Sequence, residues 1–532
     1  MSWKAEIEEL ERRRELAAAM GGPEGVARQH GRGKLTVRER IERLADPGTF
    51  REFGGLKGQG AYDPSGEQLV GFTPHAQVDG TCRIEGRKVV LTGGDFTVRG
   101  GSAAGIHGGL GAELAANERA RAWRLPYVRL LDAAGGSVRG FEELGRTYLP
   151  DGNIWSAIDV ALLSEVPVVS AVLGSVAGLP AVNACMAHFN VMLRDTAQLF
   201  PGGPPVVKAA LGYDITKEAL GGFEVHTALS GVVDNLALDE DDALRQIRRF
   251  LGYLPSSVHE PAPHIDGGTD GWAGGGTMGE AGGGDDRPEL SELVPHNRRR
   301  PFDVRRLLGL VLDEGSLFEI APGYGRSRVT GLARVHGWPV GVMANDPLHL
   351  GGATDVAAGE KVIRLIQLCD TFHLPLVSFA DEPGFMVGLD SERRGIERAG
   401  ARLVWATCQS RMPWITFVVR RLYGVAGQCQ HRPSGMFRRY AWPSANWGSM
   451  HIQGGAAAAY RREIESSPDP EQRRAEIERR LEALASPFRT AEATGQDVID
   501  PRETRALLAE FVEDAQRVLA TQLGPPPIPY RP

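Results

Sequence analysis

The sequence predicts an α/β protein in which one domain occurs twice in tandem. The segment 126–136 recurs at 375–385, and the segment 167–178 recurs at 413–424, each as an apolar run with a glycine at or next to its end. Within each copy, short runs rich in Val, Ile and Leu alternate with longer helical stretches, which is typical of βαβ units with buried, mostly parallel strands. A chain of 532 residues is also too long for a single hydrophobic core.

Composition and charge exclude several classes of protein. A net charge of −7 provides no basic footprint for nucleic acid. The longest apolar stretch, around 167–182, contains glycine and serine and is too short to span a bilayer, and the charged N-terminus predicts no signal peptide. Five cysteines without CxxC pairing fit a reducing compartment. We therefore expect a cytoplasmic protein that binds neither nucleic acid nor membrane.

The N-terminal domain is expected over residues 1–255. It begins with a charged helix over 3–20. Thr36 is expected to cap a second helix, because Glu39 stands three residues later and completes a capping box. The alternation of apolar runs and helical stretches then fills residues 80–250.

Residues 256–300 are expected to link the two domains, because they hold two Gly-Gly-Gly runs and several prolines without an apolar period. The C-terminal domain is expected over residues 301–532. There the strand–helix alternation returns over 302–452. A polar helix rich in Arg and Glu over 469–485 and a last helix over 502–522 complete it.

Each copy has a small-residue turn between an apolar strand and a helix. In the first copy the turn 174–180 precedes a helix expected over 181–194, with Pro180 at a helical start that tolerates its missing N–H. In the second copy the turn is 423–428. Both turns would present free backbone N–H groups, which stabilise a developing oxyanion. One such turn alone is more typical of close packing, but two at matching positions favour oxyanion sites.

Other chemical motifs have little support. The sequence lacks GxSxG, HExxH, an EF-hand loop and clustered histidines, so we expect no metal site. The glycine-rich segment 100–105 surrounds Ser102 without nucleophile spacing and is expected to pack against a ligand. The segment 31–36 lacks the full P-loop pattern and is expected to be a loop that leads into a helix. A turn-capping role is more typical of Asp381 and Glu382 than catalysis.

Seven short motifs stand in order along the chain: Gly33–Ile41, Gly100–Ser102, Gly202–Val207, Leu220–Gly222, Asp381–Phe385, Arg398–Leu403 and Ala441–Ala445. Each is modest alone, but the ordered set resembles the carboxyltransferase (beta) subunit of biotin-dependent acyl-CoA carboxylases, such as the propionyl-CoA and methylcrotonyl-CoA carboxylases. The resemblance covers roughly residues 5–520.

The resemblance implies two crotonase-like domains in tandem and a homohexamer. It places the active site between the N-terminal domain of one subunit and the C-terminal domain of another. Biotin, carboxylated on a separate carrier, would supply the carboxyl group that is moved to the α-carbon of an acyl-CoA. The chain shows no Met-Lys-Met biotin-attachment motif and no ATP-binding half, so we expect a partner with biotin carboxylase and biotin carboxyl carrier functions, and no metal in this subunit.

The resemblance also implies roles for individual residues. The amides of Gly178 and Leu179 would hold the thioester enolate, and those of Val425 and Ala426 the ureido oxygen of biotin. Further substrate contacts would come from Gly101, Gly135, Gly136, Gly424 and Gln428. Leu179 and Val425 each replace a glycine that is usual in the family; the amides survive this change, but a positive φ would become costly.

Three alternatives stay open from the sequence. The first is an acyl-CoA decarboxylase or transcarboxylase on the same fold. The second is a biotin-independent crotonase-type hydratase or lyase, which would need a pair of carboxylates in the pocket. The third is a non-catalytic assembly subunit. Departures from the family pattern at Glu382 and at Gly427–Cys429 leave the acyl substrate open as well.

Overall fold

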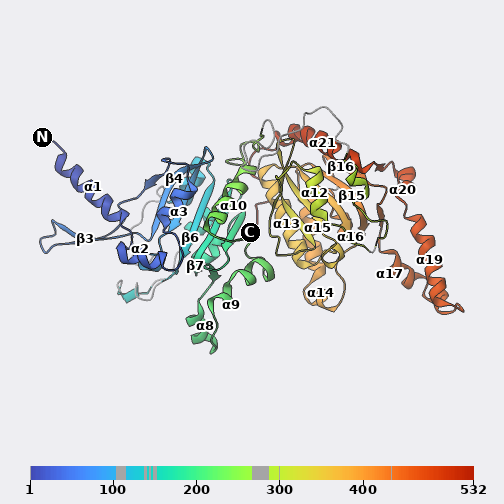
Figure 1. Ribbon diagram of the computed structural model, residues 1–532, viewed down its shortest axis with the longest axis horizontal. Coiled ribbons are helices and arrows are strands. Elements are labelled where there is room, and N and C mark those ends of the chain that lie inside the picture. The colour runs from blue at the N-terminus through green and yellow to red at the C-terminus, as the bar shows by residue number, and fades with distance from the viewer. Residues whose placement is uncertain are drawn as a thin grey trace. The chain divides into compact units, whose positions relative to one another are not determined.

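The structure is a computed structural model that describes residues 2–102, 115–136, 141–142, 145–147, 153–265, 287–298, 300–432 and 434–532. The chain divides into two compact units, Met1–Glu260 and Pro261–Arg531 (Figure 1). Residues 266–286, the centre of the predicted linker, lie outside the described residues, and the short helix α11 (Glu289–Glu292) follows them.

The N-terminal unit begins with the charged helix that the sequence predicts, α1 (Lys4–Ala18), followed by α2 (Gly22–His30) and α3 (Val37–Leu44). The capping box at the start of α3 is confirmed. The Glu39 N–H donates to the Thr36 hydroxyl, and the Thr36 N–H donates to the Glu39 carboxylate at 2.7 Å. Together these bonds satisfy two amides that the first helical turn leaves without intrahelical acceptors.

One mixed sheet forms the core of the N-terminal unit, in the order β1-β4-β5-β6-β7-β8-β10, with β9 paired to β7. Pairs β1–β4 and β4–β5 are antiparallel, and the pairs from β5 onward are parallel. Its strands are β1 (Arg51–Phe53), β4 (Gln77–Ile84), β5 (Arg87–Gly94), β6 (Tyr127–Ala133), β7 (Val168–Ala177), β8 (Phe189–Leu193), β9 (Gln198–Phe200) and β10 (Asn235–Ala237). Strands β2 (Gly58–Tyr62) and β3 (Leu69–Pro74) form a separate antiparallel pair.

Helices cover this sheet because its central strands are buried on both faces and need apolar partners. In helix α10 (Glu240–Tyr253) apolar residues recur at helical spacing, and the ring of Phe250 stacks on that of Phe189 in β8, with ring centroids 4.9 Å apart. The helices are α4 (Ala116–Trp123), α6 (Asn153–Leu162), α7 (Leu179–Cys185), α8 (Pro204–Leu211), α9 (Lys217–Gly221) and α10 (Glu240–Tyr253), with the single-turn segments η1 (Arg99–Gly101) and η3 (Val225–Leu229).

The helix predicted over 181–194 is wrong in its second half. Helix α7 ends at Cys185, and Phe189–Leu193 forms strand β8 instead. All five residues of β8 are buried, and the strand pairs with β7 on one side and β10 on the other. Two-sided pairing overrides the helical pattern here, because a continuous apolar run fits a buried strand as well as a buried helix.

The C-terminal unit repeats this arrangement, with the sheet order β11-β12-β13-β14-β15-β16-β18 and β17 paired to β15. Again the first two pairs are antiparallel and the later ones parallel. The strands are β11 (Phe318–Glu319), β12 (Arg328–Val335), β13 (Trp338–Asn345), β14 (Leu376–Glu382), β15 (Trp414–Tyr423), β16 (Phe437–Ala441), β17 (Asn446–Gly448) and β18 (Asp497–Val498). Strands β13, β14 and β15 thus occupy the places of β5, β6 and β7.

The C-terminal unit also contains the two late helices that the sequence predicts, as α19 and α21 (Figure 1). Its helices are α12 (Val304–Val311), α13 (Val356–Phe372), α14 (Leu389–Arg393), α15 (Ile396–Gln409), α16 (Gly424–Gln428), α17 (Ile452–Ala459), α18 (Arg461–Glu465), α19 (Pro470–Leu484), α20 (Pro487–Thr494) and α21 (Thr504–Leu519), with the single-turn segments η4 (Leu350–Gly352) and η5 (Pro501–Glu503). In the described part of the chain, none of the helices has the length and apolar character needed to cross a bilayer.

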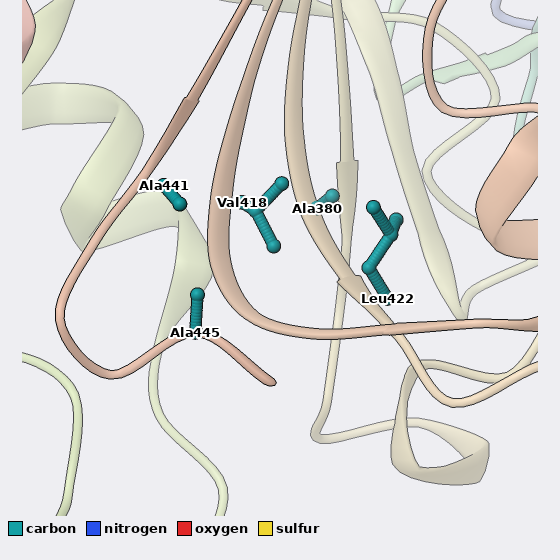
Figure 2. Close-up of a cluster of buried hydrophobic side chains, with 5 residues drawn as sticks. All are labelled: Ala380, Val418, Leu422, Ala441 and Ala445. Atoms are coloured by element: carbon teal, nitrogen blue, oxygen red, sulfur yellow. The ribbon is translucent and has the colours of Figure 1, made fainter. Parts of the chain in front are cut away.

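A small apolar cluster supports the end of β15, where the second small-residue turn begins (Figure 2). It joins Ala380 of β14, Val418 and Leu422 of β15, Ala441 of β16 and Ala445. Three of the five are alanines, so the backbones approach closely. The end of β15 is therefore held by packing, as a site that must present backbone amides at fixed positions requires.

Candidate active site

The first turn connects β7 to α7 through Gly178, whose φ of 69° and ψ of −137° lie where side-chain-bearing residues rarely fall. A Cβ at Gly178 would meet nothing within 4 Å, so glycine is required there by its backbone conformation and not by crowding. Leu179 begins the helix without a positive φ. The leucine that replaces the usual glycine therefore causes no backbone strain.

The backbone N–H groups of the first turn are only partly free. The Gly178 N–H donates to the Phe200 carbonyl at the end of β9, at 3.3 Å. Pro180 has no N–H, and the Ala181 N–H turns back to the Gly178 carbonyl at 3.0 Å. Among the described residues the Leu179 N–H has no acceptor. Of the two amides predicted to form the first oxyanion site, Leu179 is thus free and Gly178 is engaged.

The second turn connects β15 to α16, again through a glycine with positive φ, and it has more free donors. Gly424 has a φ of 61°, so the glycine again stands where positive φ is needed, and Val425 follows without one. Within the described part of the chain, neither the Val425 N–H nor the Ala426 N–H meets an acceptor. Both amides of the predicted second pair are therefore available to a ligand.

Each turn also presents an apolar side chain to the outside of its unit. Leu179 is 47% exposed and Val425 is 52% exposed, although the adjoining Ala426 is buried. The two side chains follow the positive-φ glycine in their respective copies. A ligand atom that reaches either amide would meet this side chain, so both positions are suited to control ligand fit.

The glycines predicted to contact substrate in the first copy gather at the carboxyl ends of β5, β6 and β7. A Cβ at Gly101 would lie 2.5 Å from the Asp132 carbonyl, and one at Gly135 would lie 2.5 Å from the Ala177 carbonyl and 3.7 Å from the Gly178 nitrogen. The Ser102 hydroxyl donates to the Gly135 carbonyl at 3.0 Å. The structure thus brings Gly101, Gly135 and Gly178 together.

Gly136 follows directly in the chain, and a Cβ there would meet nothing within 4 Å. Residues 103–105 of the glycine-rich segment lie outside the described residues.

In the second copy, Gly424 and the exposed Gln428 both belong to α16. Sequence reasoning missed two further glycines of this copy. Gly352 has a φ of 84° and would place a Cβ 3.0 Å from the Asp381 carbonyl, as Gly101 does against Asp132. Gly384, with a φ of 123°, follows β14 as Gly135 follows β6. The internal repeat carried this signal, because each occupies the place of a glycine that the sequence singled out.

A buried ionic cluster underlies the first turn. Asp132, at the end of β6, is fully buried and contacts the Lys34 ammonium at 2.5 Å and the Arg40 guanidinium at 3.1 Å, and Arg40 also pairs with Glu240 at 2.6 Å. Burial lowers the pKa of Lys34, and Asp132 opposes that effect. The segment 31–36 is a loop before a helix, as predicted, but its lysine has a role in the core that the sequence did not reveal.

The carboxylates below the second turn are structural. Glu382 caps Gly384, whose N–H donates to it at 2.9 Å, and accepts from Arg328 and Thr354, which confirms the predicted turn-capping role. Asp381 accepts from Arg420 and Arg421. Burial alone would raise the pKa of Asp381, but the hydrogen bonds from the two arginines outweigh it and lower the pKa. Neither group is free to act as an acid or base.

No group of three His, Cys, Asp or Glu side chains that could hold a metal ion occurs among the residues whose placement is described.

The environment of His431, which follows α16, leads us to expect that the protein loses stability in acid. Burial, helped by the charge of Arg439, lowers the pKa of His431 from 6.5 to about 4. As the pH falls, His431 therefore becomes protonated near pH 6.5 in the unfolded chain but only near pH 4 in the folded chain. We expect this group's contribution to be intact above pH 6.5 and to decline as the pH falls toward 4, by about 3 kcal/mol in the free energy of unfolding.

Urea unfolding of His431→Gln between pH 7 and pH 4.5 measures this contribution, because glutamine does not titrate. The variant should lose less stability than the wild-type protein over that interval. An equal loss in both would contradict the assignment to His431.

Comparison with known proteins agrees with this arrangement. A family model described as carboxyl transferase domain matches residues 28–519. The carboxyltransferase subunit of propionyl-CoA carboxylase from Haloferax mediterranei is 35% identical over 511 residues, which cover 95% of each chain. The alpha subunit of methylmalonyl-CoA decarboxylase from Veillonella parvula is 31% identical over 507 residues, covering 94% of this chain and 93% of the relative.

Among solved structures, the transcarboxylase 12S hexamer with methylmalonyl-coenzyme A bound is similar to this chain with a TM-score of 0.85 and 31% sequence identity, covering 97% of this chain and 96% of that chain. This likeness confirms the predicted fold of two tandem crotonase-like domains. The chain therefore belongs to the carboxyl transferase family and is a carboxyltransferase of the biotin-dependent acyl-CoA carboxylase type.

Proposed function

We propose that this chain is the carboxyltransferase subunit of an acyl-CoA carboxylase and moves a carboxyl group from biotin, held by a separate carrier, to the α-carbon of an acyl-CoA thioester. The observation that carries the proposal is the pair of matching turns, one in each repeat, with free backbone amides at Leu179 and at Val425 and Ala426. Two developing charges, one on each reactant, need two such sites.

At the first turn, the Leu179 amide would hold the thioester oxygen. When the α-carbon gives up its proton, negative charge moves onto this oxygen, and a fixed N–H stabilises that charge more strongly than the neutral carbonyl. Gly178 would contribute only if its amide left the Phe200 carbonyl. Gly101, Gly135 and Gly136 would let the substrate approach the ends of β5 and β6 closely, because they carry no side chains.

At the second turn, the amides of Val425 and Ala426 would hold the ureido oxygen of biotin. Biotin supplies the transferable carboxyl group when it is bound there. Two free donors and an exposed apolar side chain suit a small, neutral, partly apolar ring with one strong acceptor. Gly424 provides the turn conformation and Gln428 an exposed polar group beside it.

The proposal also includes partners. A subunit with biotin carboxylase and biotin carboxyl carrier functions would deliver the carboxyl group. The resemblance places the active site between subunits, and the solved 12S structure is described as a hexamer assembly, so we expect this chain to form a homohexamer. Light scattering that found an active monomer at working concentration would contradict this part of the proposal.

A second candidate function uses the same carboxyl transfer in another direction: the chain would remove a carboxyl group from an acyl-CoA, as a decarboxylase does, or move it from one carboxyl donor to another acceptor, as a transcarboxylase does. The likeness to a methylmalonyl-CoA decarboxylase subunit and to transcarboxylase 12S favours it. The hydratase alternative gains no support, because Asp132, Asp381 and Glu382 beneath the turns are all committed to cations.

The test combines the full-length protein with the biotinylated protein that co-purifies with it from the native host. We expect carboxylation of propionyl-CoA that requires this partner and is blocked by avidin. In the reverse direction, methylmalonyl-CoA should lose its carboxyl group to the same partner. Hydration of crotonyl-CoA without any carboxyl exchange would overturn the proposal in favour of a hydratase.

A further inference from the structure

A second cluster of charge lies on the N-terminal unit, at the end of β5 opposite to the candidate active site. Lys88 stands near the start of β5, whereas Gly101 follows the other end of that strand. An open cavity of about 280 Å³ occurs there, lined by Gly48, Thr49, Arg51, Thr81, Cys82, Arg83 and Lys88. Its charged lining residues are three cations, and it has no acidic lining residue.

The strand register places these three cations on one face of the sheet. Arg83 of β4 lies directly opposite Lys88 of β5, and Arg51 of β1 lies directly opposite Thr81 of β4. Residues two apart on a strand share a face, so Arg83 and Thr81 do as well. Like charges directly opposite each other on neighbouring strands destabilise a sheet. All three cations are exposed, so water and salt weaken this repulsion, and a bound counter-charge would remove the remainder.

The described residues provide no such counter-charge. None of the three cations forms an ion pair with a described carboxylate; Arg51 and Arg83 donate to backbone carbonyls, those of Gly48 and Gly86 among them. Two nearby carboxylates are already committed. Asp46 accepts from the Glu85 and Gly86 amides, and Glu52 pairs with Arg38 at 2.9 Å.

The surroundings limit the kind of anion that fits. The Lys88 ammonium and the Arg119 guanidinium both lie over the Trp123 ring, at 5.0 and 4.9 Å. With two cations at this ring, it is a poor platform for a nucleobase. A neighbouring cavity of about 550 Å³ shares Gly48 and Arg51 but is lined by Glu42 and Asp46 as well, which disfavours an anion there.

We propose that the cavity between Arg51, Arg83 and Lys88 is an anion site for a phosphate or diphosphate group, distinct from the carboxyl-transfer site. Three convergent cations match the charge of such a group, and two of them are guanidiniums with several donors each. Binding would remove the repulsion between Arg83 and Lys88 and so stabilise the N-terminal unit. The group could belong to free diphosphate or to the tail of a nucleotide.

The experiment measures thermal unfolding and calorimetric binding of the full-length protein with inorganic phosphate, diphosphate and ADP, against sodium chloride at matched ionic strength. At about ten times its dissociation constant, diphosphate should raise the unfolding temperature by about 2 °C or more. Tighter binding of ADP than of diphosphate would identify a nucleotide as the source of the group, and tighter binding of diphosphate would identify the free anion. Both results support the site.

The variants Arg83→Gln and Lys88→Gln test the assignment. Each should lose at least about tenfold in diphosphate affinity, because one charge-assisted contact is removed. Without ligand, neither should be less stable than the wild-type protein, because the like-charge pair is gone. The control Arg43→Gln removes an exposed arginine paired with Asp241 and should bind diphosphate as the wild-type protein does.

Two results would overturn the site. One is the absence of a diphosphate effect beyond that of sodium chloride. The other is an unchanged diphosphate affinity in the double variant Arg83→Gln/Lys88→Gln. Neither result bears on carboxyl transfer, so the proposed function is tested separately.

Discussion

Leu179→Pro should lower carboxyl transfer to every acyl-CoA by about a hundredfold or more, because it deletes the amide that is free at the first turn. Loss of one oxyanion donor costs about 3–4 kcal/mol of transition-state stabilisation. The first position of a helix tolerates proline well, and the preceding Gly178 has no side chain to clash with the ring. The fold should therefore survive the substitution.

Leu179→Gly and Leu179→Ala are the matched controls, since both keep the N–H and shorten the side chain. Because Leu179 is about half exposed beside the amide, these variants should retain measurable turnover and shift preference toward bulkier thioesters. A change in pocket size is usually worth about 1–3 kcal/mol per methylene. The assay is carboxyl transfer across acyl-CoAs of increasing length, with circular dichroism to verify folding. Activity near wild type in folded Leu179→Pro would remove residue 179 from the oxyanion site.

The duplicated architecture could be predicted from the sequence because it rests on local signals. Apolar runs, small-residue turns and the Thr36–Glu39 capping box are each recognised from a few neighbouring residues, and each appears in the structure where the sequence placed it. The helix expected over 181–194 failed because the second half of that segment is a strand held by two partners distant in sequence. Strand pairing with distant residues cannot be recognised from the sequence of the segment itself.

The sequence located the turns of the candidate site, but it could not show which amides are free. Positive φ falls on Gly178 and Gly424, one residue before Leu179 and Val425, so the substitutions that looked costly occupy ordinary helical positions. The Gly178 amide is engaged because β9 pairs with the end of β7, which is a long-range contact. The two turns therefore differ in donors although their sequences look alike.

The buried ionic cluster of Lys34, Arg40, Asp132 and Glu240 beneath the first turn should make a large contribution to the free energy of unfolding. Asp132→Ala should lower the free energy of unfolding by about 3–5 kcal/mol, because it leaves buried cations without their counter-charge. Arg40 keeps Glu240 as a partner, whereas Lys34 loses its only recorded ion pair among the described residues. Urea unfolding measures the change, and Asp241→Ala, which breaks the exposed pair with Arg43, should cost less than about 1 kcal/mol.

The pH dependence of the Asp132→Ala deficit shows whether Lys34 causes it. Burial lowers the pKa of Lys34 even with Asp132 present, and removal of the carboxylate should lower that pKa further. A lysine whose folded pKa lies below its unfolded value makes the folded state gain stability as the pH rises between the two. The deficit relative to wild type should therefore shrink as the pH rises toward the ordinary lysine pKa of about 10.4, since the variant can leave Lys34 neutral. A Cβ at Gly174 of β7 would lie 2.1 Å from the Asp132 carboxylate, so the two residues are in close contact. A deficit that does not change as the pH rises would assign the loss to this packing contact and not to an unpaired ammonium, because a lost packing contact does not titrate.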